Sequence, residues 1–333
     1  MKLAAILAAI AGIILGTCVV GYYGFGAVAD ALLAIGWGGF ALVCLFHLGL
    51  FFVLGLCWWA VVPGKRGVTP WVLTIARAIR DASSDVLPLS QIGGFVMGAR
   101  AATLMGMASD MAIATTVVDV TMEMLAQLVY VALGLGLLVY ARPGTDLAYG
   151  VGAGLAVTLA AAVGFIVAQR RALNLFETFA KRIAHQSLPA ATARMTTMQD
   201  AIHACYESPS RLALGSSLHV VGWIGNGIEA WIALLLMGVN VGLPAVLTIE
   251  SLLYAARSLA FFVPNAVGVQ EGAYVMLGSI YGLPPETMLA LSLLKRARDI
   301  AIGVPVLLFW QALEGGRLWK RRPRPALAAR KHS

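Results

Sequence analysis

Residues 87–94 read LPLSQIGG, and residues 263–272 read VPNAVGVQEG. Each stretch is a proline–glycine break that opens a short apolar segment, and the two short segments end at Gly106 and Gly282. A longer apolar segment with ionisable residues follows each of them. Paired breaks of this kind predict a polar site inside a membrane, framed by broken or re-entrant helices. The predicted hinge residues are Pro88, Gly93 and Gly94 at the first break and Pro264, Gly268 and Gly272 at the second.

The composition outside the breaks is that of a membrane protein. Of the 333 residues, 60% are hydrophobic and 12% are charged, and the mean hydropathy is +0.84. These values exclude a soluble domain. Because about 20 apolar residues are needed to cross a bilayer as a helix, we predict an all-α polytopic protein with about seven or eight spans. The apolar runs occupy residues 3–23, 36–62, 111–140, 147–168, 212–238, 245–263 and 285–313.

The order of segments repeats weakly along the chain. In each half, two spans precede a break, a short segment follows, and a longer charged segment comes last. We therefore predict one membrane domain, residues 1–316, with halves at 1–169 and 212–316. A cytoplasmic interfacial segment, 170–211, joins the halves, and a basic cytoplasmic tail follows at 317–333. The alternative is that the breaks are ordinary kinks, since proline and glycine are frequent in membrane helices.

Positive charges collect beside the predicted spans, which predicts orientation rather than a nucleic-acid partner. Cationic flanks face the cytoplasm, so both termini are expected there. The three basic groups are Lys65, Arg66, Arg77 and Arg80; Arg170, Arg171, Lys181, Arg182, Arg194 and Arg211; and Arg317, Lys320, Arg321, Arg322, Arg324, Arg330 and Lys331.

Metal and cofactor chemistry is not predicted. Cys18, Cys44, Cys57 and Cys205 show no paired or metal-ligand spacing. No glycine-rich phosphate loop is present, so active transport would need an ion gradient or a partner. His47 and His219 stand alone in apolar segments, where a hydrogen bond to a neighbouring helix is more common than a proton relay or a ligand role.

Charged residues inside the predicted spans are the candidate site. Each would cost about 2.5 to 3.5 kcal/mol at the centre of a bilayer, so they must face each other, a wet cavity or a charged ligand. One account pairs Asp119 and Glu123 with Arg296 and Arg298 as a fixed ion-pair network. The other assigns Glu271, Lys295, Arg296, Arg298 and Arg100 to a lipid head group, with Asp119, Glu123, Glu250, Arg257 and Asp299 as counter-charges.

These residues resemble a known family. The stretch from Val263 to Gly272 is similar to the proline, glycine and glutamate signature of the lysylphosphatidylglycerol synthase transmembrane, or flippase-like, superfamily. SQIGG at 90–94, LSLLKRAR at 291–298 and WQALE at 310–314 are similar to its hopanoid-biosynthesis-associated branch. The chain departs from the family where Asn265 and Ala266 replace two glycines, and where Phe95 replaces an acidic residue.

The resemblance implies a multi-pass protein of the bacterial inner membrane that moves a lipid, or helps to move one, between leaflets. Hopanoids or another amphipathic lipid are the expected cargo, and other lipid-synthesis proteins are the expected partners. No aminoacyl transferase domain follows the membrane region, so lipid aminoacylation is not expected. The alternatives are a membrane enzyme with Asp119, Glu123 or Glu271 as base, and a non-catalytic subunit of a lipid-synthesis complex.

Overall fold

The fold is helical throughout the part of the chain that the structure describes. The computed structural model describes residues 26, 29–30, 33–64, 67–85, 91–141, 153–154, 156–157, 159–160, 163–164, 189–260, 263 and 266–320. The main helices are α3 (Gly36–Val61), α4 (Pro70–Asp85), α5 (Gln91–Leu104), α6 (Ser109–Ala141), α8 (Pro189–Tyr206), α9 (Pro209–Leu236), α10 (Leu243–Leu259), α11 (Val269–Ile280) and α12 (Pro285–Lys320). The predicted all-α polytopic fold is confirmed.

Three of these helices are long and apolar enough to cross a membrane. They are α3, α6 and α9, with 26, 33 and 28 residues, and they coincide with three of the predicted spans. At about 1.5 Å per residue each exceeds the roughly 30 Å of hydrocarbon. Helices α10 and α12 occupy two more predicted runs. The run at 3–23 lies outside the described residues, as does most of the run at 147–168.

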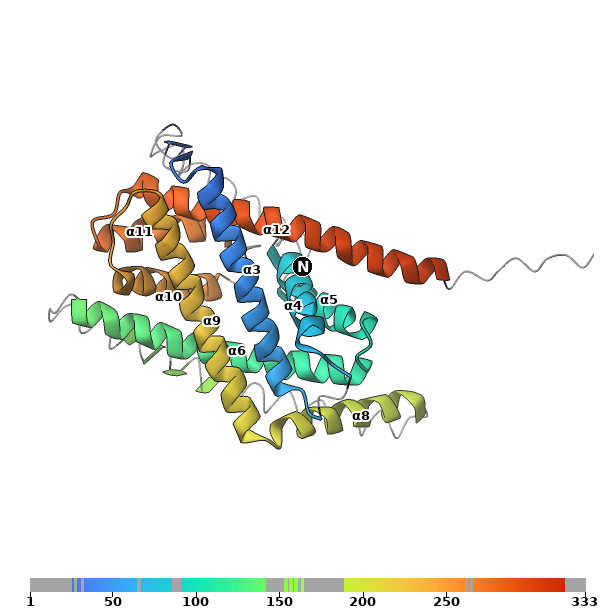
Figure 1. Ribbon diagram of the computed structural model, residues 1–333. Helices are drawn as coiled ribbons and strands as arrows, with labels where there is room; N and C mark the ends of the chain where they lie inside the picture. Colours follow the sequence, from blue (N-terminus) through green and yellow to red (C-terminus); the bar gives the residue numbers. More distant parts are fainter. Residues whose placement is uncertain are drawn as a thin grey trace, which may run out of the picture.

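Helices α3 and α9 lie side by side through the middle of the molecule, with α4 and α5 to one side and α10 and α11 to the other (Figure 1). Glycines on α9 make this close approach possible. A Cβ atom at Gly225 would lie 2.5 Å from Leu50 Cδ2, and one at Gly222 would lie 3.0 Å from Leu54 Cδ2. Small residues allow helices to pack closely where lipid gives no hydrophobic driving force.

The short helices after the two breaks are present in both halves. Helix α5 has 14 residues and α11 has 12, so neither can cross about 30 Å of hydrocarbon alone. Gly106 follows α5 with φ of 107° and Gly282 follows α11 with φ of 70°. These left-handed conformations favour glycine, and they turn each short helix into the long helix that follows it.

Helix α4 is packed inside the protein. It packs against α3, α5 and α12, and the side chains of Arg77 and Arg80 are only 4% exposed. Both arginines belong to the first basic group from which orientation was predicted, and that orientation stays a prediction. Carboxylates on α6 neutralise them, so they are stable inside the protein. Lys65 and Arg66 lie outside the described residues.

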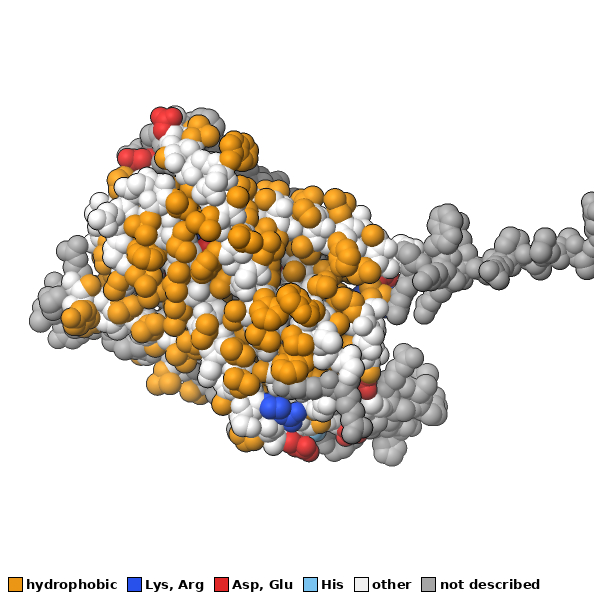
Figure 2. Space-filling view, in the orientation of Figure 1, with side chains coloured by type: hydrophobic (Ala, Val, Ile, Leu, Met, Phe, Trp, Pro, Cys, Tyr) orange, Lys and Arg blue, Asp and Glu red, His pale blue; other side chains and the backbone are white. Residues whose placement is uncertain are grey.

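The outer face over α3 and α9 is mostly apolar (Figure 2). Trp37 is 88% exposed and Leu45 is 67% exposed, which is expected of side chains that face lipid. Helix α8 packs on α6 through Ala201 and Ile202. The first four residues of the predicted tail, 317–320, belong to α12. The rest of the tail, and residues 170–188 of the predicted interfacial segment, lie outside the described residues.

Candidate functional site

A cluster of charges joins α4 to α6, and we call Arg77, Arg80, Asp81, Asp119, Glu123 and His219 the α4–α6 cluster. Arg80 Nη1 donates to Asp119 Oδ2 at 2.9 Å, and Arg77 Nη2 donates to Glu123 Oε1 at 2.5 Å. Arg80 also bonds Glu123, while Arg77 bonds Asp81 at 2.8 Å. The two arginines stand one helical turn apart on α4, and the two α6 carboxylates have a similar spacing, so the pairs meet face to face.

Histidine extends the α4–α6 cluster to α9. The Nε2 atom of His219 lies 2.9 Å from Asp119 Oδ1. The side chains of His219 and Asp119 are 1% and 0% exposed. Asp119 therefore uses one oxygen for the arginines and the other for the imidazole. The ring of Phe95 lies under the Arg80 guanidinium, with its centroid 4.5 Å from Arg80 Cζ, so an aromatic face occupies the position where the resemblance implied an acid.

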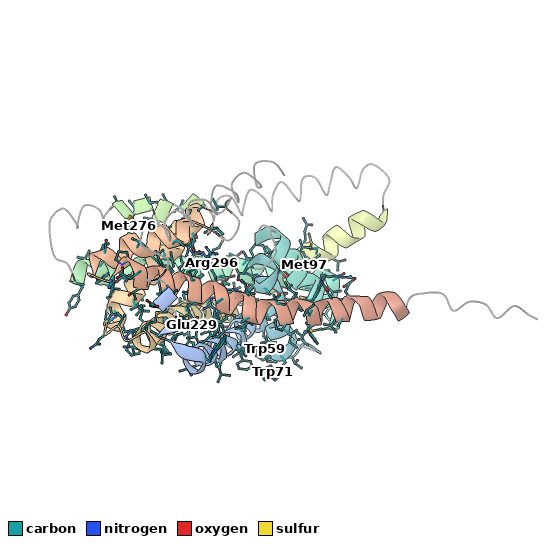
Figure 3. All side chains as sticks on the ribbon, turned by 90° about the horizontal axis from the view of Figure 1, so that it is seen from above. Trp59, Trp71, Met97, Glu229, Met276 and Arg296 are labelled. Atoms are coloured by element: carbon teal, nitrogen blue, oxygen red, sulfur yellow. The ribbon has the colours of Figure 1, made fainter. Side chains whose placement is uncertain are left out.

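A second set of charges lies on α12 and its neighbours, and we call His47, Glu229, Arg298 and Asp299 the α9–α12 cluster. Glu229 on α9 accepts from Arg298, and its Oε2 atom lies 2.8 Å from His47 Nδ1 on α3. Arg298 also donates to Asp299 at 2.6 Å. Figure 3 shows Glu229 and Arg296 on opposite sides of α12. Arg298, which bonds Glu229, and Arg296 therefore lie in different surroundings.

Lys295 on α12 forms a third buried contact. Its Nζ atom donates to Glu250 Oε2 on α10 at 2.6 Å, and Tyr274 on α11 donates to Glu250 Oε1 at 2.5 Å. Glu250 is fully buried. Because both carboxylate oxygens are satisfied, the buried charge pair meets the condition under which such pairs persist at low dielectric.

The second break forms a polar centre around Glu271. Gly268 begins α11 with φ of 82°, and its N–H donates to Glu271 Oε2 at 2.7 Å. Arg296 Nε donates to Glu271 Oε1 at 2.7 Å, and Ser292 donates to the same oxygen at 3.0 Å. Ala266 just before has φ of 46°, a conformation that explains why glycine would suit this position.

A small cavity lies between α3, α4 and α12. Its lining includes His47, Asp85 and Asp299, with Phe51, Ala82, Ile302 and Gly303. It has room for about one water molecule. Because Asp85 and Asp299 belong to different halves, the cavity marks a polar seam between them, but it is far too small for a lipid head group.

The sequence matches the family model described as lysylphosphatidylglycerol synthase TM region over residues 4–306. The chain belongs to this family. Neither the comparison with curated proteins nor the comparison with solved structures returned a match. Membership of the lysylphosphatidylglycerol synthase TM family places the chain among membrane proteins connected with lipids, in agreement with its apolar helices.

Most of the predicted site residues of this family member lie in the interior, but their ion-pair partners differ from the predicted ones. Asp119 and Glu123 pair with Arg77 and Arg80 rather than with Arg296 and Arg298, because the arginines of α4 reach the carboxylates of α6. Arg296 pairs with Glu271 instead. Arg257 is half-buried, with its guanidinium 5.5 Å from the centre of the Tyr254 ring.

Arg100 does not join the buried charges. Its side chain is 47% exposed and bonds Glu314 at 2.7 Å on the outside of the bundle. Gly94, one of the predicted hinge residues, serves close packing, since a Cβ atom there would lie 2.7 Å from the Arg80 carbonyl oxygen. Pro88 and Pro264 lie outside the described residues, so the hinge prediction for both stays a prediction.

The sequence did not identify the roles of several contributors to these clusters. Arg77 and Arg80 were interpreted as loop cations, although their spacing of three residues places them on one helix face. Glu229 is a lone acid in an apolar run and was overlooked. His219 was expected to bond a neighbouring helix, as it does, but no pattern in the sequence indicates that its partner is Asp119.

Cys44, Cys57 and Cys205 are free thiols. Cys205 lies on α8, outside the candidate spans, and burial raises the pKa of its thiol to about 11. The thiol is therefore neutral near pH 7 and a poor nucleophile.

Proposed function

We propose that this protein moves an amphipathic lipid between the leaflets of the bacterial inner membrane, or assists that movement, with a hopanoid or a related lipid as cargo. Family membership supports a connection with lipids. The buried charges support a polar pathway, because each would cost about 2.5 to 3.5 kcal/mol if it faced hydrocarbon. Holding the head group in such a pathway avoids the cost of dragging it through the acyl chains.

The polar centre at the second break carries the proposal. Arg296 is 18% exposed, whereas Lys295 and Arg298 are 6% and 5% exposed. The start of α11 adds backbone N–H groups and the positive end of its dipole beside Glu271. An anionic or hydroxyl-bearing head group would replace Glu271 on Arg296, since a guanidinium presents several donors in a fixed plane.

Head-group entry in this proposal requires the ion pairs to exchange partners. Lys295, Arg296 and Arg298 of α12 are paired here, and the cavity beside His47 and Asp299 has room for about one water. This arrangement suits a closed state of a transporter. Opening would separate the halves along the seam that His47, Asp85 and Asp299 line, and release would restore the contact between Arg296 and Glu271.

We also propose that the lipid leaves chemically unchanged. Glu271 accepts bonds from Arg296, Ser292 and the Gly268 N–H, a set of donors that favours the ionised form and makes it a weak base. Partners of the lipid-synthesis apparatus would then deliver or collect the cargo. Mass spectrometry of lipids after incubation with the purified protein tests this point, since a new lipid product would indicate an enzyme.

A reconstitution experiment tests translocation. Vesicles of phosphatidylethanolamine and phosphatidylglycerol would carry the full chain and a head-group-quenchable fluorescent phosphatidylglycerol. We expect Arg296→Gln and Glu271→Gln to slow leaflet exchange by about tenfold, which corresponds to about 1.4 kcal/mol in the barrier. The matched control is Asp200→Asn, which makes the same change from acid to amide at an exposed position of α8.

The outcomes separate the accounts. Folded variants that exchange lipid as fast as the unchanged protein would contradict this assignment of the site. If Arg296→Gln aggregates on size-exclusion chromatography while Glu271→Gln is folded and fully active, the pair is a structural ion pair only. No exchange by the unchanged protein would overturn translocation by this chain alone.

A further inference from the structure

His219 is a buried histidine with one nitrogen unused. Its Nε2 atom lies 2.9 Å from Asp119 Oδ1, and its side chain is 1% exposed. The Nδ1 atom has no hydrogen-bond partner. A neutral ring leaves a bare lone pair there, and a protonated ring leaves a bare N–H, so either form leaves one buried hydrogen-bonding group unmet in this conformation.

The charged groups around His219 carry a net negative charge that one proton would neutralise. Asp119 and Glu123 of α6 adjoin His219. Arg77 and Arg80 of α4 bond these carboxylates, Arg77 also bonds Asp81, and the uncharged Cys57 thiol of α3 lies near the same group. With the carboxylates ionised, two positive charges meet three negative ones. A proton on His219 would cancel the excess negative charge, and a balanced group of charges is the form that a low-dielectric interior favours.

The contact between His219 and Asp119 also crosses between the two halves of the chain. Arg77 and Arg80 bond carboxylates of their own half, and Lys295, Arg296 and Arg298 do the same in the second half. The contact from His47 to Glu229 also joins the halves, with the histidine in the first half and the acid in the second. Buried ionisable contacts between the halves therefore include two that involve histidine, the side chain whose charge changes most readily near neutral pH.

We infer that His219 and Asp119 form a proton-binding site between the halves, and that proton binding there drives lipid movement. The second part rests on the proposed function. A proton taken up at Nδ1 converts the imidazole to an imidazolium, and the bond to the Asp119 carboxylate then joins two opposite charges and holds the halves together. Release of that proton weakens the bond and allows the halves to separate.

Proton binding is tested first, without lipid transport. The full chain with isotope-labelled histidine would be placed in lipid nanodiscs, and infrared difference spectra would follow imidazole protonation between about pH 5 and 8. We expect His219→Gln to remove one titrating imidazole, while the glutamine amide can still donate to Asp119. His203→Gln, which removes an exposed histidine of α8, calibrates the signal of one imidazole.

Coupling is tested in vesicles with the same fluorescent phosphatidylglycerol and an imposed pH difference. If one proton moves with each lipid, each pH unit supports up to about a tenfold ratio of reporter between leaflets. We expect this asymmetry with the unchanged protein and with His203→Gln, and we expect it to be absent with His219→Gln.

The results distinguish this inference from the proposed function. If the unchanged protein exchanges reporter but produces no asymmetry, coupling is overturned while translocation stands. If it moves no reporter but His219 titrates, translocation fails while the proton site stands. Equal numbers of titrating imidazoles in folded His219→Gln and the unchanged protein overturn the site. The asymmetry measurement on the unchanged chain decides coupling even if His219→Gln does not fold.

Discussion

The two halves of this protein share an order of helices but carry opposite charges on their long helices. After the first break, α6 carries the acids Asp119 and Glu123, and α4 neutralises them. After the second break, α12 carries Lys295, Arg296 and Arg298, and acids of α9, α10 and α11 neutralise them. Arg77, Arg80, Lys295, Arg296 and Arg298 thus pair with acids of their own half, and histidines contribute buried bonds between the halves. Cohesion within a half and switching between halves can therefore use different residues.

The largest effect is expected from breaking the first half. Asp119→Ala would leave Arg77 and Arg80 with Glu123 and Asp81 alone and would remove the acceptor of His219. Loss of one partner in a buried ion pair costs about 3 to 5 kcal/mol, and we expect the upper end of that range. Thermal unfolding in detergent would measure it, with Asp200→Ala as the exposed control. A melting temperature equal to that of the unchanged protein would show that the cluster is not what holds α4 on α6.

A somewhat smaller effect is expected in the second half. Lys295→Met leaves Glu250 buried with only the Tyr274 hydroxyl, and we expect a loss near the lower end of about 3 to 5 kcal/mol. Adding Glu250→Gln should recover most of that loss, because the unpaired charge disappears. The same unfolding assay on both single variants and the double variant gives the coupling free energy. Additive losses would mean that the pair does not interact.

Replacing a glycine by alanine should have opposite effects on protein stability in the two short helices, α5 and α11. Gly94→Ala in α5 places a Cβ atom 2.7 Å from the Arg80 carbonyl oxygen, and overpacking of this kind costs about 1 to 3 kcal/mol. Gly272→Ala in α11 meets nothing within 4 Å, so the better helix propensity should stabilise the protein by up to about 1 kcal/mol. Equal shifts in unfolding temperature for the two variants would contradict the difference in packing.

The smallest effect is expected at Arg100. Its bond to Glu314 is exposed, and exposed ion pairs contribute about 0 to 1 kcal/mol. Arg100→Ala should therefore change the unfolding temperature very little, and the reporter exchange rate should stay close to that of the unchanged protein. A large loss of exchange would return Arg100 to the head-group site, where the sequence analysis placed it.

Local sequence patterns predicted the parts of this fold that depend on nearby residues. Runs of apolar residues located α3, α6 and α9, and glycines located the ends of α5 and α11. Charge pairing could not be predicted in the same way. Asp119 lies 39 residues from Arg80 and 100 residues from His219, and no periodicity connects positions so far apart. The sequence therefore indicated which charges would be buried, but assigned Asp119 and Glu123 the wrong partners.

By itself, the sequence determined that the chain is a helical membrane protein, because hydrocarbon thickness and backbone hydrogen bonding leave few alternative folds. It also determined that the chain has two breaks and that several charged residues lie within its apolar segments. Only the tertiary structure decided that the arginines of α4 bond the acids of α6, that Arg296 bonds Glu271, and that His219 reaches Asp119. The physical reason is that burial favours ion pairs strongly but does not specify which opposite charge is the partner. Helix packing makes that choice by bringing particular faces within a few ångströms of each other.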